Sequence, residues 1–456
     1  MARKLFGTDG VRGVAGSFLS AELALALGRA AAANTRVERP QVLIIRDTRE
    51  SGEMLQAALA AGVSAAGGDA LVAGVLPTPA APLLIGRYGF HLAAVISASH
   101  NPYQDNGIKF FAGDGYKLSD DAELEIERML EQAPAPAPGR AAAPGYDPAP
   151  GVGTAPALGR IRELRGAPED YLRELHVRFA DLDLHGMDVL LDCANGATYQ
   201  VAPEAFRRLG ATVSVIADAP DGRNINAGCG STHVDALAER MRAGAHAVGF
   251  AFDGDGDRVL AVDRRGEVVD GDELMALAAL HLRDSGRLAG DGVAVTVMTN
   301  YGFHEAMRDA GVAVGVTSVG DRYVLEELRA RGWTLGGEQS GHIIDMGFNR
   351  TGDGIASALL TLEALGGRDL SERDAMRKLP QRLVNVRVRD RGALEHAHEL
   401  DAAVRAAEQE LSGRGRVLVR ASGTEPLVRV MVEAPTEHEA DEVCGRLVAV
   451  VERELA

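Results

Sequence analysis

Apolar runs and polar turns alternate along the chain in three successive units of similar design. Each unit contains three apolar segments that predict strands, and Ala- and Leu-rich segments with helical spacing lie between them. The nine predicted strands are residues 42–49, 70–79 and 91–97, then 189–196, 211–218 and 246–252, then 293–300, 312–321 and 333–337. Strands that alternate with helices predict an α/β fold with parallel or mixed sheets.

The alternation of predicted strands and helices is interrupted in two places. Residues 133–160 are rich in Ala, Pro and Gly, which cannot build an apolar core and therefore predict a linker or a surface loop. After residue 368 a strand (383–388), a long helix (394–411), two strands (417–420 and 428–434) and a closing helix from Glu437 predict a small α+β domain. The predicted division is three α/β domains at 1–135, 161–256 and 257–368, a linker at 136–160 and an α+β domain at 369–456.

The composition is that of a soluble globular chain. Of its 456 residues 46% are hydrophobic and 25% are charged, which is enough to form several cores. A formal net charge of −17 argues against nucleic acid or an anionic membrane surface as a partner, because both select clustered positive charge. Three scattered cysteines and the absence of a secretory signal predict a reducing, cytoplasmic location.

The third strand of the second unit runs directly into Asp253, Asp255 and Asp257, which alternate with glycines. Three carboxylates so close together repel one another, so a divalent cation is the natural compensation. Three side chains leave positions for water and a phosphate oxygen, which favours Mg²⁺ over Ca²⁺. An EF-hand is excluded because Arg258 and Arg264 occupy the positions of its glycine and closing glutamate. The alternative, an acidic surface turn, is disfavoured by the apolar strand before it.

The third strand of the first unit ends in the sequence SASHNP at residues 97–102. A Ser-His hydrolase is disfavoured, because no GxSxG motif surrounds the serines and no acid is positioned to orient His100. A serine beside Mg²⁺ can instead carry a phosphoryl group. The spacing alone does not choose between Ser97 and Ser99, and a polar strand end remains the alternative. Further on, Asn106 and Gly107 predict a turn into a strand with Lys109, where a lysine is ordinarily exposed.

Two other polar loops offer groups that suit phosphate and sugar. In the sequence RASGTEPLVR, two arginines, two hydroxyls and a glycine favour a phosphate site over an ordinary hairpin turn. In GEQSGH, Glu338, Ser340 and His342 offer donors and acceptors for sugar hydroxyls. Alone, that second motif is better interpreted as a loop that satisfies its own polar groups.

Taken together these motifs, with FGTDGVRG at 6–13 and NGIKFF at 106–111, resemble the α-D-phosphohexomutase superfamily over essentially the full chain. The resemblance implies four domains in a heart-shaped arrangement around a central cleft. It also implies interconversion of glucosamine 6-phosphate and glucosamine 1-phosphate, through a phosphoserine and a bound sugar bisphosphate, for cell-wall precursor synthesis. Ser99 would be the phosphoserine, and Asp253, Asp255 and Asp257 would hold one Mg²⁺ together with it.

The other roles that the resemblance implies fall into two groups. Arg12, His100, Lys109 and His342 would lie near the transferred phosphate, with Lys109 and His342 as candidate proton carriers. The substrate would be held by Arg258, Glu338 and Ser340, and its distal phosphate by Arg420, Ser422, Gly423, Thr424 and Arg429.

Other activities fit parts of the pattern. A mutase for glucose or mannose phosphates would use the same mechanism, and a metal-dependent phosphatase would use the same groups but release inorganic phosphate. A silent sugar-phosphate-binding protein would lack a nucleophile or a ligand, and here none is missing. The expected partner is a small amino sugar phosphate, with no nucleic acid and no membrane, and a homodimer is left open.

Overall fold

The computed structural model describes residues 4–7, 9–132, 157–390, 394, 396–421 and 426–455. Residues 136–156 of the predicted linker lie outside the described residues. The same is true of Ser422, Gly423 and Thr424, the middle of the predicted phosphate loop. In the part of the chain that the structure describes, no helix is both long and apolar enough to cross a membrane.

Three sheets share one strand order, in which three parallel strands are followed by one antiparallel strand. The first sheet contains β3 (Asp69–Val75), β2 (Gln41–Arg46), β4 (Leu92–Ile96) and β5 (Asp105–Ala112) in that order. The second contains β8 (Thr212–Ile216), β7 (Asp188–Asp192), β9 (Val248–Phe252) and β10 (Val259–Asp263). The third contains β13 (Ala313–Thr317), β12 (Gly292–Thr296), β14 (Leu335–Gly337) and β15 (Ile343–Asp345). The mixed α/β fold predicted from the sequence is confirmed.

Short strands extend the first two sheets beyond this common order. In the first sheet β1 (Val11–Val14) pairs with β5, and β6 (Ile161–Glu163) pairs with β3. In the second sheet β11 (Val268–Val269) pairs with β10. Boundaries at 160/161 and 256/257 would therefore separate β6, β10 and β11 from the sheets that hold them. We propose that the first unit extends through Glu163 and the second through Val269.

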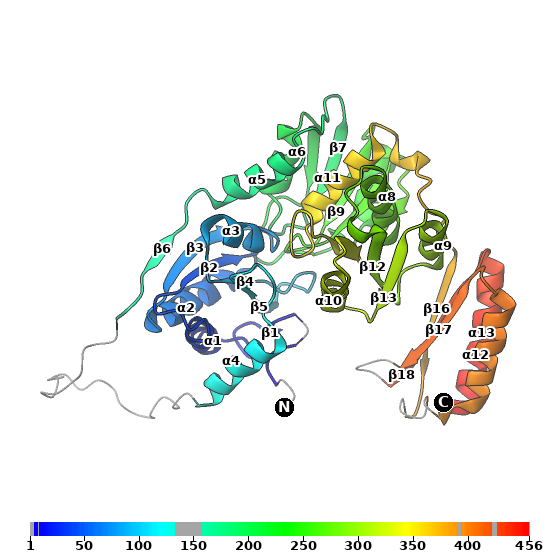
Figure 1. Cartoon of the computed structure of the whole chain (residues 1–456), viewed down its shortest axis with the longest axis horizontal. Coiled ribbons are helices and arrows are strands. Elements are labelled where there is room, and N and C mark those ends of the chain that lie inside the picture. Colours follow the sequence, from blue (N-terminus) through cyan, green and yellow to red (C-terminus); the bar gives the residue numbers. More distant parts are fainter. Residues whose placement is uncertain are drawn as a thin grey trace, which may run out of the picture.

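Helices connect the strands and cover the sheets (Figure 1). Their ends carry sequence signals: Ser20 caps the first helix by accepting the N–H of Leu23, and Asp270 and Glu273 form a reciprocal capping box. The helices of the three α/β units are α1 (Ala21–Asn34), α2 (Gly52–Ala65), α3 (Ala80–Tyr88), α4 (Asp120–Gln132), α5 (Ala167–Arg178), α6 (Val201–Arg208), α7 (Asp235–Ala243), α8 (Gly271–Asp284), α9 (Tyr301–Asp309), α10 (Asp321–Arg331) and α11 (Gly354–Leu365), with short 3₁₀ turns at Ala289–Asp291 and Leu370–Glu372.

One hydrophobic core runs through the three α/β units. It contains Val95 of the first sheet, Phe250 of the second and Val295 of the third, all fully buried. Each such side chain contributes about 1.5–3 kcal/mol when it is removed from water. Because the core is continuous, the loops at the ends of the three sheets hold fixed positions relative to one another.

The fourth unit is the small α+β domain that the sequence predicts. Its sheet has the antiparallel order β16 (Gln381–Arg387), β18 (Leu427–Glu433), β17 (Arg416–Ala421), covered by α12 (His398–Leu411) and α13 (Glu437–Leu455). It has its own core. Figure 1 shows the four units following one another in an arc, from the blue first unit to the orange and red fourth unit.

A buried carboxylate joins the fourth unit to the third. Glu433, at the end of β18, is fully buried and accepts hydrogen bonds from the Tyr301 N–H at 2.8 Å and from Arg416 Nε at 2.7 Å. Arg416 in turn donates from Nη1 to the Val297 carbonyl at 2.8 Å. Asn300 adds a tie by donating to the Leu379 carbonyl at 3.0 Å. These contacts fix one end of the fourth unit against the start of α9.

A buried aspartate in the third unit should make stability depend on pH. Burial, and then the neighbouring Asp270, raise the pKa of Asp272 to about 7 from an ordinary 3.8. The folded state therefore binds more protons than the unfolded state between pH 4 and 7, so this contribution to stability falls as the pH rises through that window. We expect Asp272→Asn to raise the melting temperature by a few degrees at pH 8 and by much less at pH 5. Thermal melts at both pH values check this, with the exposed Asp284→Asn on the same helix as the control, expected to show no such pH-dependent difference.

Candidate active site

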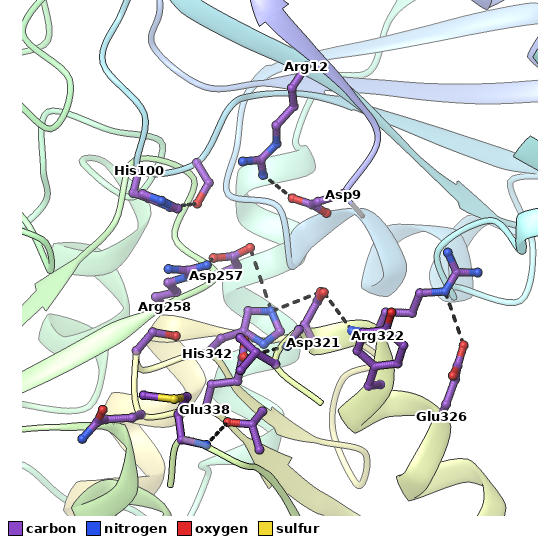
Figure 2. Close-up of a pocket in the computed structure, with 18 of the residues that line it drawn as sticks. Asp9, Arg12, His100, Asp257, Arg258, Asp321, Arg322, Glu326, Glu338 and His342 are labelled. Carbon is purple, nitrogen blue, oxygen red and sulfur yellow. Dashed lines mark hydrogen bonds and ion pairs between the residues drawn. The ribbon is translucent and has the colours of Figure 1, made fainter. Parts of the chain in front are cut away.

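A cavity of about 640 Å³ lies where loops from the three α/β units meet. It is lined by Ser99 and His100 after β4, by Asp257 and Arg258 after β9, and by the loop that follows β14. These are the carboxyl ends of the third strand in each sheet, the edge where loops of α/β sheets gather ligands. The three loops that the sequence singled out are thus brought together (Figure 2).

Ser99 is one of the residues that line this cavity. Its side chain is almost fully buried, and its Oγ donates to Asp253 Oδ2 at 2.5 Å and lies 3.3 Å from His100 Nδ1. Its backbone has φ of +51°, a left-handed conformation that costs a non-glycine residue about 1–2 kcal/mol. Ser97, by contrast, points away and donates to Asp47 at 2.6 Å. Of the two serines, only Ser99 faces the aspartates.

The three aspartates form one compact group. Asp253, Asp255 and Asp257 are buried, and each offers an oxygen within 4.8 Å of the others. Among the described residues, Oδ1 of Asp255 and Oδ1 of Asp257 are buried without a hydrogen-bond partner. Burial, and then the charges of Asp257 and Asp255, raise the pKa of Asp253 well above its usual range. Buried, unpaired carboxylate oxygens fit a hard divalent cation, so the group can hold a metal ion.

Lys109 lies under the aspartates and is only 1% exposed, so the interpretation of this lysine as a surface residue is wrong. Its Nζ is 2.7 Å from Asp255 Oδ2, 3.2 Å from Asp9 Oδ2 and 3.7 Å from Asp257 Oδ2. The predicted turn at residues 106–107 is also wrong: these residues belong to β5, which pairs with β1 and β4 and so carries Lys109 into the interior. Burial alone lowers the Lys109 pKa, but the three carboxylates outweigh it and raise the pKa, so the side chain is an ammonium.

A chain of alternating charges continues from Lys109 to the opposite wall. Asp9 also pairs with Lys117, and Lys117 pairs with Asp321 of the third unit. His342 Nε2 then lies 3.9 Å from both Asp321 Oδ2 and Asp257 Oδ2. Dashed lines mark both contacts in Figure 2. His342 is buried, and neither ring nitrogen has a hydrogen-bond partner among the described residues. Its ring is therefore available to a ligand.

Cationic groups occupy the wall around Ser99. Arg12 forms an ion pair with Asp9, and Arg258 Nε lies 3.8 Å from Asp257 Oδ1 (Figure 2). The backbone N–H of Arg258 donates to Asp253 Oδ1 at 3.2 Å, which anchors the aspartate loop. Burial, and then Arg258 and Arg12, lower the pKa of His100, so its imidazole is neutral at pH 7. A chain of net charge −17 thus places positive charge where an anionic ligand would approach Ser99.

The sugar-binding loop predicted from GEQSGH also lines the cavity. Glu338 accepts the Gly320 N–H on Oε1 at 3.0 Å, which couples this loop to the start of α10. Ser340 is exposed and lines the same cavity. The wall continues with Arg322, which pairs with Glu326 and Asp120.

The two arginines of the predicted phosphate loop lie apart from this cavity. Arg420 and Arg429 line a small neighbouring pocket with Met298, and Met298 also lines the main cavity. They stand directly opposite each other on β17 and β18, an arrangement that is destabilising for like charges unless an anion lies between them. Burial, and then Arg429, lower the pKa of Arg420. The two positive charges are therefore placed where a bound anion would stabilise both.

Several residues of the site could not be identified as functional from the sequence. Asp9 lies inside FGTDGVRG and Asp321 ends the predicted strand 312–321, but neither position indicates a role by itself. Lys117 lies in none of the motifs that the sequence analysis identified. Thr78, which donates to Asp255 Oδ2 at 2.6 Å, follows a strand and is recognisable only from the fold.

Models of one protein family match nearly the whole chain. The phosphoglucomutase/phosphomannomutase alpha/beta/alpha domain I matches residues 3–136, domain II matches 169–266, domain III matches 270–383 and the C-terminal domain matches 383–450.

Curated relatives are similar over their full length. The chain is 52% identical over 453 residues to the phosphoglucosamine mutase of Moorella thermoacetica, covering 97% of this chain and 98% of that one. It is 46% identical over 457 residues to the phosphoglucosamine mutase of Bacillus subtilis, covering 99% of each.

Solved structures share the fold. A phosphoglucomutase/phosphomannomutase family protein from Burkholderia thailandensis superposes with a TM-score of 0.80 at 21% identity, covering 99% of this chain and 97% of that one. The Aspergillus fumigatus N-acetylphosphoglucosamine mutase, solved in complex with GlcNAc-6P and magnesium, superposes with a TM-score of 0.64 at 18% identity, covering 100% and 96%.

Proposed function

Because the chain belongs to the phosphoglucomutase/phosphomannomutase family, we propose that it interconverts glucosamine 6-phosphate and glucosamine 1-phosphate. Relatives named phosphoglucosamine mutase, at about half identity over the full length, support this choice of substrate. The observation that carries the mechanism is the contact of Ser99 Oγ with Asp253, beside two further buried carboxylates. The product would supply UDP-N-acetylglucosamine and cell-wall synthesis in the cytoplasm.

The reaction conserves phosphate overall. Starting from phospho-Ser99, the O1 hydroxyl of glucosamine 6-phosphate attacks phosphorus, the P–Oγ bond breaks, and the O1 proton passes to a basic group of the site. The bound bisphosphate then reorients, Ser99 Oγ attacks the phosphorus of the 6-phosphate, the P–O6 bond breaks, and O6 takes up a proton from the site. The first phosphorylation of the enzyme comes from a sugar bisphosphate primer or another phosphate donor. Such transfers depend on positioning and on neutralising charge.

The proposed metal ion is Mg²⁺, one per chain, held by Asp253, Asp255, Asp257 and the phosphorylated Ser99. When bound, it would neutralise charge on the transferred phosphoryl group. The structure of the Aspergillus fumigatus relative, solved with magnesium, supports this choice of metal.

The remaining residues would position the sugar and move protons. The buried ring nitrogens of His342 have no hydrogen-bond partner among the described residues, and Nε2 lies 3.9 Å from the carboxylates of Asp257 and Asp321, which suits a proton carrier. Lys109 is held as an ammonium by three carboxylates, so we propose that it acts as an acid or as a fixed positive charge. Arg12, His100 and Arg258 would surround the transferred phosphate, and Glu338 and Ser340 would bind sugar hydroxyls. Arg420 and Arg429, with the loop of Ser422, Gly423 and Thr424, would hold the distal phosphate.

Turnover on three substrates tests the proposed function. We expect 1-phosphate to form from glucosamine 6-phosphate with a kcat/KM at least about 10-fold above that for glucose or mannose 6-phosphate. Protein groups that bind the 2-amino group would be less well paired with the hydroxyl that replaces it in the two analogues. A coupled assay for each 1-phosphate measures this. Faster turnover of glucose or mannose 6-phosphate would assign the alternative mutase. Steady release of inorganic phosphate without isomerisation would assign a phosphatase.

A further inference from the structure

Two side chains from different units converge on the backbone that carries Ser99. Arg49, after β2 of the first unit, donates from Nη2 to the Ser99 carbonyl at 3.0 Å and to the Asn101 carbonyl at 2.7 Å. Asn226 of the second unit donates from Nδ2 to the same two carbonyls, at 2.9 and 3.1 Å. Nothing in the sequence patterns pointed to either residue. The hydrogen bonds of both side chains go to backbone carbonyls and not to the Ser99 hydroxyl.

The other side of the Ser99 peptide is held as well. The Ser99 N–H donates to Ser97 Oγ at 2.9 Å, and Ser97 Oγ donates to Asp47 Oδ2 at 2.6 Å. Asp47 Oδ2 also lies 3.5 Å from Arg49 Nε, so the two charges compensate each other beneath the loop. A backbone at φ of +51° persists only where its surroundings determine it from several sides. Here both the N–H and the carbonyl of Ser99 are fixed.

The aspartate loop packs closely against the backbone of Ser99 and the side chain of Asn226. A Cβ on Gly254, within the aspartate loop, would come within 2.5 Å of the Ser99 carbonyl oxygen and 2.7 Å of Asn226 Nδ2. The Arg49 side chain is fully buried, a costly place for a guanidinium. Asn226 has a left-handed backbone of its own, with φ of +58°. The anchors, the serine loop and the aspartate loop therefore form one tightly packed unit.

We propose that Arg49 and Asn226 are positioning residues, which hold Ser99 in its left-handed conformation so that Oγ faces Asp253 and the metal site. This inference rests on the proposed function and adds to it. Since one anchor belongs to the first unit and the other to the second, the alignment of the nucleophile depends on the contact between these units. The anchors act on the transfer step and leave sugar binding unchanged, because Glu338, Ser340 and the arginine pair on β17 and β18 lie elsewhere.

Kinetics of matched variants test this inference. We expect Arg49→Met to lower kcat about 10²-fold, the scale reported for a misplacement of about 1 Å, with KM for glucosamine 6-phosphate unchanged within about twofold. Asn226→Gly keeps the left-handed backbone and removes the amide, so it should lower kcat about tenfold without changing KM. Arg49→Lys, which keeps the charge and a donor, should recover part of the loss. Single-turnover transfer from the phosphorylated enzyme should slow by the same factors as kcat.

Arg39→Met is the matched control, because Arg39 is an arginine of the same unit that pairs with Asp69 at the opposite end of the sheet, where β2 and β3 begin. It should keep the wild-type kcat, and circular dichroism should show all variants folded. If Arg49→Met does not fold, the kcat of Asn226→Gly tests the inference by itself. A normal kcat in a folded Arg49→Met or Asn226→Gly, or a loss confined to melting temperature, would overturn the inference. A wild-type enzyme that does not isomerise glucosamine 6-phosphate would instead refute the proposed function.

Discussion

Replacing Ser99 with alanine should lower isomerisation by about 10⁴-fold or more, the scale seen when a covalent nucleophile is removed. The transfer requires Oγ to hold the phosphoryl group beside the aspartates, and Ser99 Oγ is the hydroxyl that lies 2.5 Å from Asp253. The fold should persist, because the substitution removes only the contacts of Oγ with Asp253 and His100, worth about 1 kcal/mol each. Coupled assays give the rate, and intact mass with peptide mapping should find one phosphate at Ser99 in the wild-type protein and none in the variant.

Ser97→Ala is the informative companion to this variant. Ser97 supports the Ser99 backbone but points toward Asp47, so the variant should still carry its phosphate at Ser99 even if turnover slows. Near-normal turnover by Ser99→Ala, or a phosphate mapped to another residue, would refute the assignment of the nucleophile.

Removing divalent metal should lower activity about 10³-fold or more, since a bound cation supplies several kcal/mol of charge stabilisation in the transition state. Dialysis against a chelator and titration with Mg²⁺ measure the loss and its recovery. A second measurement is independent of turnover: Mg²⁺ should raise the melting temperature of the wild-type protein, because it compensates the buried carboxylates of Asp253, Asp255 and Asp257.

Asp253→Asn separates metal binding from folding. Since burial and two neighbouring carboxylates disfavour the charge on Asp253, the variant without metal should melt at or above the temperature of the metal-free wild type. It should also lose most of its activity and most of the Mg²⁺-dependent rise in melting temperature. Full activity in the presence of chelator, with no effect of Mg²⁺ on melting, would contradict a metal site at the three aspartates.

Much of the fold could be predicted from the sequence because its strands are short apolar runs bounded by polar turns. All nine strands predicted in the α/β units are present, among them β2, β7 and β12, the first predicted strand of each unit. The pairing of strands is a different matter, because it depends on contacts that local patterns do not encode. This is why β10 and β11 were assigned to the third domain although they extend the second sheet.

The residues of the candidate site likewise divide into those that could be predicted from the sequence and those that could not. Ser99 and the three aspartates lie in dense local motifs, so their chemistry could be inferred from spacing and resemblance. Lys109 and Lys117 depend on partners 146 and 204 residues away in the chain, Asp255 and Asp321, and their burial follows only from how the sheets pack. Arg49 and Asn226 act through backbone carbonyls, which leave no trace in a side-chain pattern.

Because Glu433 anchors one end of β18 to the third unit, any tilt of the strand would turn about this residue. The fulcrum is this carboxylate at one end of β18, while Arg429 stands four residues away on the same strand, or about 13 Å at the usual rise of a strand. Rocking the strand by about 5° around the fulcrum would carry the guanidinium through roughly 1 Å, since displacement grows with the length of the arm. A small tilt at the anchored end would therefore shift the proposed phosphate-binding arginine by about an ångström.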